Sequence, residues 1–381
     1  MNFVTLQQVP TLTVGEGCAA EVGRWLKQRG CRRPLLVSCA VLDETCRRLM
    51  RVWEGEGLEF AYLPEVPAEP TVGQFEALRA SARERAPDAV VGLGGGSVLD
   101  VAKLLAALLD RFEPVTAVLG IDRLEGRSLP LVCLPSTAGT GSEVSPNAIL
   151  LDESAGLKQG VISRFLVPDA AFVDPELTYS LPPGVTAATG FDALTHCIEA
   201  YANRHAHPWV DAVALQGIRW IGAHLVRAVR DGGDREARRY LAYGSLCGGL
   251  CLGPVNTAAV HALAYPLGGR FRVPHGVANA VLLPHVLRFN LEAAPERYAE
   301  VARALGVAEA GPAEEVARRG VERIEEMARV CGLPRGLSEL GVRREDLPAM
   351  ARAALQVQRL LRNNLRQVSE PDARAIYEAA F

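Results

Sequence analysis

Hydrophobic and polar positions follow different patterns in the two halves of this 381-residue chain. In the first half, short apolar runs alternate with stretches in which apolar residues recur at helical spacing. The apolar runs predict strands at 34–38, 59–63, 89–93, 129–134, 148–151 and 171–173, and the stretches between them predict helices at 44–53, 72–86 and 98–109. Such alternation is typical of a parallel sheet covered by helices. The first half therefore predicts an α/β domain.

The pattern changes after Pro182-Pro183-Gly184, the strongest local breaker in the chain. Beyond it, nearly every periodic segment has helical spacing, at 186–203, 208–230, 236–251, 277–290, 295–305, 313–330 and 370–380. Strand patterns are nearly absent there. We therefore predict an α/β domain at 1–185 and an all-helical domain at 186–381.

Composition narrows the class of protein. Hydrophobic residues make up 49% and charged residues 22%, as in soluble globular proteins. A net charge of -3 argues against nucleic acid or an anionic membrane as a partner. The N-terminus lacks signal-peptide features, and no apolar run is long enough to span a bilayer. Nine scattered cysteines without a Cys-x-x-Cys pair indicate reduced thiols, so we expect a cytoplasmic protein.

Four potential metal ligands lie in the second half. Asp192 and His196 are four residues apart in a segment of helical composition, so their side chains should share one helix face. Prolines and glycines interrupt the segment between His261 and His275, which predicts that His261 ends one helix and His275 begins the next. One carboxylate and three imidazoles would suit a divalent transition ion. Each residue alone has a commoner explanation, as a surface histidine or an ordinary i,i+4 contact.

Two polar loops follow predicted strands. The glycine cluster 92–96 separates a buried strand from a helix, where backbone N–H groups can approach a pyrophosphate and the helix dipole favours negative charge. The loop 137–142 combines glycines with hydroxyl groups. A tight strand–helix turn also needs glycine, and hydroxyls often serve turn hydrogen bonds, so both loops leave a structural explanation open.

Taken together, four stretches resemble the iron-containing, group III alcohol dehydrogenase family. They are 94–103 (GGGSVLDVAK), 135–144 (PSTAGTGSEV), 190–201 and 261–290, they occur in the family's order, and the similarity covers essentially the whole chain. The resemblance implies a Rossmann-like N-terminal domain, an all-helical C-terminal domain and an active site in the cleft between them.

The resemblance also implies the site residues. The metal ligands would be Asp192, His196, His261 and His275. The cofactor-binding residues would be Gly94, Gly95, Gly96, Ser97, Asp100, Thr137, Thr140, Ser142, Lys158 and Leu177. The chain has only three lysines, and two of them, Lys103 and Lys158, fall within this pattern.

Two positions depart from the family pattern. Many members that prefer NAD carry an aspartate at the end of an early strand, where this chain has Ser38 and Cys39. A small neutral pair leaves room for a 2′-phosphate, so the cofactor can be either NAD or NADP. The second departure is Tyr265, where family members often have a histidine in the proton path. Tyr265 is our candidate catalytic residue, although packing against the nicotinamide is an equal alternative.

The function that follows is hydride transfer between NAD(P) and a small alcohol and its aldehyde or ketone, with a divalent metal as Lewis acid. We expect Fe²⁺ first and Zn²⁺ as the alternative, and a homo-oligomer, a dimer by resemblance. Maleylacetate reductase and glycerol dehydrogenase share the fold and stay open as alternatives. A lyase resembling dehydroquinate synthase is disfavoured, because the helical domain has no lysine for a phosphate substrate.

Overall fold

The computed structural model describes residues 3–154, 157–308 and 310–381, and its contacts divide the chain into two compact units. The α/β unit comprises Gln7–Thr137 and Gly141–Thr178. The helical unit comprises the N-terminal stretch up to Leu6, the short segment Ala138–Thr140 and Tyr179–Phe381. The domain boundary that we placed near residue 185 stays a prediction.

A six-stranded sheet forms the centre of the α/β unit, in the order β1-β9-β6-β4-β2-β3 with all strands parallel. The strands are β1 (Thr11–Val14), β2 (Pro34–Val37), β3 (Ala61–Leu63), β4 (Ala89–Gly94), β6 (Leu131–Pro135) and β9 (Ala170–Val173). The predicted parallel α/β sheet is confirmed. Its edge strand β1 was not predicted, because only four residues with half of them exposed give a weak apolar pattern.

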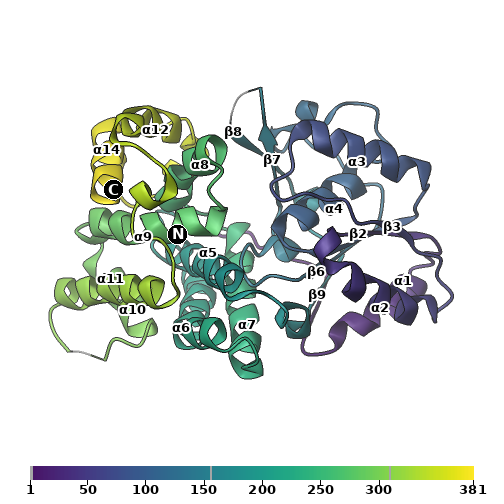
Figure 1. Ribbon diagram of the computed structural model, residues 1–381, viewed down its shortest axis with the longest axis horizontal. Coiled ribbons are helices and arrows are strands. Elements are labelled where there is room, and N and C mark those ends of the chain that lie inside the picture. The colour runs from purple at the N-terminus through teal and green to yellow at the C-terminus, as the bar shows by residue number, and fades with distance from the viewer. Residues whose placement is uncertain (1–2, 155–156, 309) are drawn as a thin grey trace. The chain divides into compact units, whose positions relative to one another are not determined.

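Successive strand residues point to opposite faces of this sheet, and helices cover both faces (Figure 1). Leu35 and Val37 of β2 belong to one core cluster with residues of α3 (Val72–Glu84) and α4 (Gly96–Leu108). Leu36 belongs to the other cluster, with residues of α1 (Val22–Gln28) and α2 (Asp43–Glu54). Burial on both faces explains why the strands are continuous apolar runs.

A second, three-stranded sheet has the order β5-β8-β7 and lies in the same unit. It consists of β5 (Gly120–Ile121), β7 (Asn147–Asp152) and β8 (Leu157–Ile162), and β7 and β8 pair antiparallel with Leu151 opposite Lys158. The strand β8 was not predicted, since Lys158, Gln159 and Gly160 break its apolar pattern. This pairing fixes the position of Lys158.

The helical unit contains ten α-helices within the described residues (Figure 1). They are α5 (Pro183–Tyr201), α6 (Pro208–Arg230), α7 (Arg235–Leu252), α8 (Ala259–Phe271), α9 (His275–Leu291), α10 (Pro295–Ala304), α11 (Ala313–Val330), α12 (Leu347–Ala354), α13 (Gln358–Leu361) and α14 (Glu370–Ala379). The predicted all-helical second half is confirmed. None of the described helices is both long and apolar enough to cross a bilayer.

One helix boundary was predicted wrongly. Pro266 lies inside α8, so His261 stands in the first turn of that helix instead of ending one. The residues from Ala259 to Gly268 are all buried, and their packing outweighs the lost backbone hydrogen bond at the proline. His275 begins α9, as predicted.

Helix α5 packs against α6, α7 and α9. The contact between α5 and α9 is very close, because a Cβ atom added at Gly276 would lie 2.1 Å from the carbonyl oxygen of Ala188. Only glycine allows the two backbones to approach so closely. This contact brings the start of α9 next to the middle of α5, where Asp192 lies.

Candidate functional site

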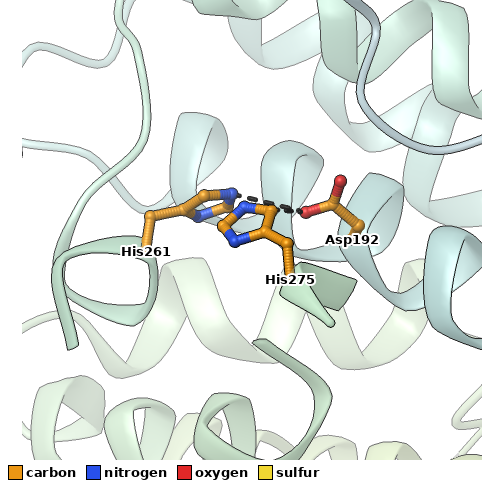
Figure 2. A group of neighbouring side chains, drawn as sticks. All are labelled: Asp192, His261 and His275. Carbon is orange, nitrogen blue, oxygen red and sulfur yellow. Dashed lines mark ion pairs between the residues drawn. The ribbon is translucent and has the colours of Figure 1, made fainter. Parts of the chain in front are cut away.

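One carboxylate oxygen lies at the centre of the four candidate ligands. The Oδ1 atom of Asp192 is 3.8 Å from Nε2 of His196, 3.5 Å from Nε2 of His261 and 3.6 Å from Nε2 of His275. Figure 2 shows the imidazoles of His261 and His275 turned toward this carboxylate. We call these four side chains the Asp192 cluster.

Three helices supply the cluster. Asp192 and His196 are one turn apart on α5, His261 lies in the first turn of α8, and His275 begins α9. One ligand atom from each of Asp192, His261 and His275 lies within 4.8 Å of the others. The ring of His196 stacks on that of His261, with centroids 4.7 Å apart. The structure therefore brings all four predicted residues together, with His196 at the side of the tighter group of three.

Glu199 orients His261 and was missed by the sequence analysis. Its Oε2 atom lies 2.6 Å from Nδ1 of His261, and its two oxygens accept hydrogen bonds from the backbone N–H groups of Ala258 and Val260. The carboxylate thus caps the start of α8 and directs the Nε2 atom of His261 toward Asp192. A signal was present in the sequence: Asp192, His196 and Glu199 are spaced i, i+4, i+7, which places them on one helix face.

Asn279 was missed as well. Its side-chain amide donates a hydrogen bond of 2.7 Å to Oδ1 of Asp192, and its Nδ2 atom lies 3.2 Å from Nε2 of His261 and 3.3 Å from Nε2 of His275. Asn279 follows His275 by one turn of α9, so helical spacing places both side chains on the same face of that helix and could have pointed to Asn279. The amide shows that the carboxylate and both imidazoles turn toward one common point.

Buried charge sets the electrostatics of the cluster. Burial alone raises the pKa of Asp192, but His196, His275 and His261 outweigh it and hold that pKa well below its usual range. Burial alone lowers the pKa of His261, but the carboxylates of Glu199 and Asp192 raise it to about 10. The two carboxylates therefore favour a positive charge between them.

These residues fit a divalent metal ion. A carboxylate oxygen and three imidazole nitrogens are the donors that iron and zinc sites use. Among the described residues, the buried Nδ1 of His196 has no hydrogen-bond partner, and the other ring nitrogen, Nε2, is the one that lies near Asp192. The carboxylate of Glu199, which contacts Nδ1 of His261, also matches the hydrogen-bond partner that the second ring nitrogen of a metal-bound histidine usually has.

Tyr265 lies beside the cluster on α8. Its ring centroid is 6.3 Å from that of His275, and its hydroxyl accepts a hydrogen bond of 2.6 Å from Nη2 of Arg359, the second residue of α13. No local pattern in the sequence points to Arg359, because it lies 94 positions from Tyr265 in the chain. The neighbour of the candidate catalytic residue is thus a cationic side chain.

The glycine loop runs from the end of β4 into α4, with Gly95 as the residue before the helix. A Cβ atom at Gly94 would lie 2.6 Å from the side chain of Val98, and one at Gly95 would lie 3.3 Å from Thr137. Ser97 accepts a hydrogen bond from the backbone of Glu69, whose carboxylate pairs with Lys158 at 2.7 Å. Ser97 thus lies in the first turn of α4 and is linked through Glu69 to Lys158, while Thr137 lies next to Gly95. The first N–H groups of a helix have no partner within the helix.

The polar residues of α4 hold neighbouring segments in place. Asp100 accepts hydrogen bonds from the Ser142 hydroxyl and from the backbone N–H of Ile149, at 2.6 and 2.9 Å. The ammonium group of Lys103 is fully buried and donates to the carbonyl oxygens of Ser145 and Asn147. Burial raises the pKa of Glu143 to about 7, against the lowering effect of Lys103. The motif therefore fixes the loops around the glycines.

The remaining predicted cofactor residues lie in different surroundings. The hydroxyl of Ser38 is buried and donates to the carbonyl of Leu93, so Cys39 is the more accessible of that pair. A backbone bridge places Glu65 opposite Cys39. Leu177 is buried in a core cluster of the α/β unit, and Thr140 belongs to the segment that packs with the helical unit. Their cofactor roles stay predictions.

Two family models match the chain. The model described as iron-containing alcohol dehydrogenase matches residues 10–175, and the model described as the C-terminal part of the Fe-containing alcohol dehydrogenase family matches residues 186–381. The chain is 39% identical to long-chain-alcohol dehydrogenase 1 of Geobacillus thermodenitrificans, covering 100% of this chain and 98% of that one. It is 35% identical to the NAD-dependent methanol dehydrogenase of Bacillus methanolicus, covering 91% and 92%. A solved structure of 1,3-propanediol oxidoreductase matches over the full length of both chains, with a TM-score of 0.96 and 34% identity.

The role of Glu199 gives a first prediction. Glu199→Gln should keep the side-chain volume but weaken the hold on His261, and we expect metal affinity to fall about 10- to 100-fold, as for other residues that support a metal-bound histidine. Competition with a chelator of known affinity measures this change. The matched control is Glu236→Gln, an exposed carboxylate on α7. Equal metal affinity in Glu199→Gln and the unaltered protein would remove Glu199 from this role.

Glu143 gives a second prediction, for stability against pH. Because its pKa is raised from 4.5 to about 7 in the folded protein, the folded state holds a proton that the unfolded chain has already lost in this range. This group therefore lowers the free energy of unfolding as pH rises from about 4.5 to about 7, by roughly 3 kcal/mol. We therefore compare the free energy of unfolding of Glu143→Gln with that of the unaltered protein by urea unfolding, at pH 5 and at pH 8. The difference should favour the variant more at pH 8 than at pH 5.

The exposed Glu125, also in the α/β unit, provides the control for that experiment. The difference between Glu125→Gln and the unaltered protein should not change with pH. A Glu143→Gln difference that is the same at both pH values would show that Glu143 has the same pKa in the folded and unfolded states.

Proposed function

Because the chain belongs to the iron-containing alcohol dehydrogenase family, and is a metal-dependent oxidoreductase of alcohols and their carbonyl partners, we propose that the Asp192 cluster holds its metal ion. The observation that carries this proposal is the position of three Nε2 atoms within 3.8 Å of one buried carboxylate oxygen. We propose Fe²⁺ as the ion, with Zn²⁺ as the alternative that the same donors accept.

The reaction is a two-electron transfer. When bound, the metal supplies Lewis-acid polarisation of the carbonyl oxygen, and the reduced nicotinamide supplies the hydride. In the reducing direction the carbonyl carbon gains the hydride and the oxygen gains a proton, so that an alcohol and the oxidised cofactor leave. Asp192 and Glu199 keep negative charge around the histidines. We propose that the phenol of Tyr265 passes a proton or donates a hydrogen bond to the substrate oxygen.

We propose that the pyrophosphate of NAD(P) binds at the glycine loop. Support comes from the first turn of α4, whose N–H groups have no partner within the helix, and from Ser97 in that turn. Thr137 lies next to Gly95, and Lys158 is linked to Ser97 through Glu69. The choice between NAD and NADP would be made near Cys39, where the strand β2 ends without an aspartate. One relative, the methanol dehydrogenase of Bacillus methanolicus, is described as NAD-dependent.

The relatives named here act on alcohols of very different size, from methanol to long-chain alcohols and diols. We propose a small alcohol and its aldehyde or ketone as substrates for this chain. A homodimer in the cytoplasm is the proposed state of the protein, on the family resemblance alone.

The metal assignment has a direct test. His275→Ala should reduce the bound metal to background, because it removes one of only four donors, and should lower the turnover of alcohols at least about 100-fold. Elemental analysis of the purified protein measures the metal independently of activity. His205→Ala is the control, since His205 is exposed and belongs to the same unit. A His275→Ala protein with one equivalent of metal would contradict the proposal.

Cofactor preference has its own test. The unaltered enzyme should use NADP(H) at least comparably to NAD(H), and Cys39→Asp should shift the ratio of kcat/KM toward NAD by about tenfold or more, because a carboxylate repels the 2′-phosphate. Cys39→Asn, which has the same shape without the charge, is the control. An unaltered enzyme that uses NAD alone would overturn this proposal, and Glu65→Gln would then test whether the carboxylate opposite Cys39 excludes NADP.

A further inference from the structure

The loop that follows β6 is divided between the two units. Its middle, Ala138–Thr140, belongs to the helical unit, whereas Thr137 and the residues from Gly141 onward belong to the α/β unit. Ala138 is 3% exposed and is part of the large core cluster of the helical unit. The unit that carries the candidate metal ligands therefore also holds the middle of a loop whose two ends lie in the other unit.

Gly139 makes a very close contact with α5. A Cβ atom added to Gly139 would lie 2.7 Å from Cβ of Thr189 and 3.1 Å from its Cα atom and its carbonyl oxygen. Only glycine allows the loop to approach the helix so closely. Thr189, Asp192 and His196 are spaced i, i+3, i+7 on α5, so they share one face of that helix. Gly139 thus packs on the helix face that bears two of the candidate metal ligands.

The backbone of Gly139 also acts on His196 itself. Burial lowers the pKa of this imidazole, and the Gly139 backbone is among the groups that oppose the effect. Both residues belong to the helical unit, so their contact does not depend on the α/β unit. A shift of Gly139 along α5 would therefore change the surroundings of His196.

The two ends of the loop are held on α4. The hydroxyl of Ser142 donates a hydrogen bond of 2.6 Å to Asp100, and a Cβ atom at Gly95 would lie 3.3 Å from Thr137. Only three residues, those packed with α5, separate Thr137 from Gly141. So short a connection has little slack, and a shift of its middle is passed to the residues on either side.

We propose that Gly139 is a positioning residue that couples two binding events: a metal ion at the Asp192 cluster tightens the binding of the cofactor, and the cofactor tightens the binding of the metal ion. This inference rests on the proposed function, because it takes the metal ion to bind at that cluster and the pyrophosphate to bind at the start of α4. The metal ion restricts His196 and α5, Gly139 extends this restriction to the loop, and a loop that is already ordered costs less to bind.

The test uses ADP-ribose, which contains the adenosine and the pyrophosphate but no nicotinamide ring that could contact the metal ion directly. Titration calorimetry measures its Kd for the full chain after removal of metal by a chelator and after reloading with Zn²⁺. We expect the Kd to be about fivefold or more lower with metal, the lower end of typical coupling between sites. Saturating ADP-ribose should lower the Kd of Zn²⁺, measured by chelator competition, by the same factor, because coupling is reciprocal.

A variant at Gly139 tests the route of the coupling. Gly139→Ala places a Cβ atom against Thr189 and displaces the loop from α5, so metal should change the Kd of ADP-ribose by less than about twofold. The matched control is Gly184→Ala, a glycine of α5 at which an added Cβ atom has no neighbour within 4 Å. This control should keep the full coupling.

The opposite side of the contact gives a second variant. Thr189→Gly removes the Cβ atom on which Gly139 packs and adds no overlap, so it should weaken the coupling even if Gly139→Ala does not fold. The double variant Gly139→Ala/Thr189→Gly moves a Cβ atom from the helix to the loop and should restore part of the coupling. Circular dichroism verifies that each variant is folded.

Two outcomes would overturn the inference. One is an unaltered protein that binds ADP-ribose with the same Kd with and without metal. The other is a folded Gly139→Ala or Thr189→Gly variant that keeps the full coupling. A chain that takes up no metal ion, or that does not bind ADP-ribose at all, would instead contradict the proposed function. Independent binding of both is a distinct result, which contradicts only the coupling.

Discussion

The helical unit depends on two carboxylates that α5 carries into its interior. Asp192 and Glu199 are 2% and 5% exposed, and a buried carboxylate is strongly destabilising unless it is paired and hydrogen-bonded. Asp192 is satisfied by imidazoles from α5, α8 and α9 and by the amide of Asn279. Glu199 is satisfied by the first turn of α8 and by His261. Any separation of these helices leaves a charge unpaired, so the same interactions that stabilise the unit also hold its histidines in place.

Close packing of the helices allows these side chains to meet. The contact of Gly276 with the backbone at Ala188 brings α9 against α5, and α8 continues through Pro266 because its whole first half is buried. If the Asp192 cluster holds a metal ion, as proposed, its donors are positioned on rigid helices before the ion arrives, which lowers the cost of binding. The short helix α13 adds Arg359 beside Tyr265, so a segment near the C-terminus takes part in the surroundings of the Asp192 cluster.

The α/β unit uses buried polar groups in a similar way. Asp100 and Lys103 face the interior and bind backbone groups of the segments that follow β6, so they shape the loops next to the glycines. Ser97 and Lys158 are joined through Glu69, which lies far from both in the chain. In this motif the backbone at the start of α4 offers the N–H groups, and the charged side chains keep that backbone in position.

The sequence alone determined the fold class and the four residues of the Asp192 cluster. Continuous apolar runs record strands that are buried on both faces, helical spacing records the buried face of a helix, and the candidate ligand types at their spacing matched a family pattern. Tertiary structure alone decided the rest. Pro266 does not end α8, since packing outweighs local preference there. Ser38 is turned inward and Glu65 lies opposite Cys39, because strand pairing sets both. Arg359 reaches Tyr265 only through the packing of α13 on α8. Contacts between residues far apart in the chain leave no periodic signal in the sequence, and the surroundings of each ligand consist of such contacts.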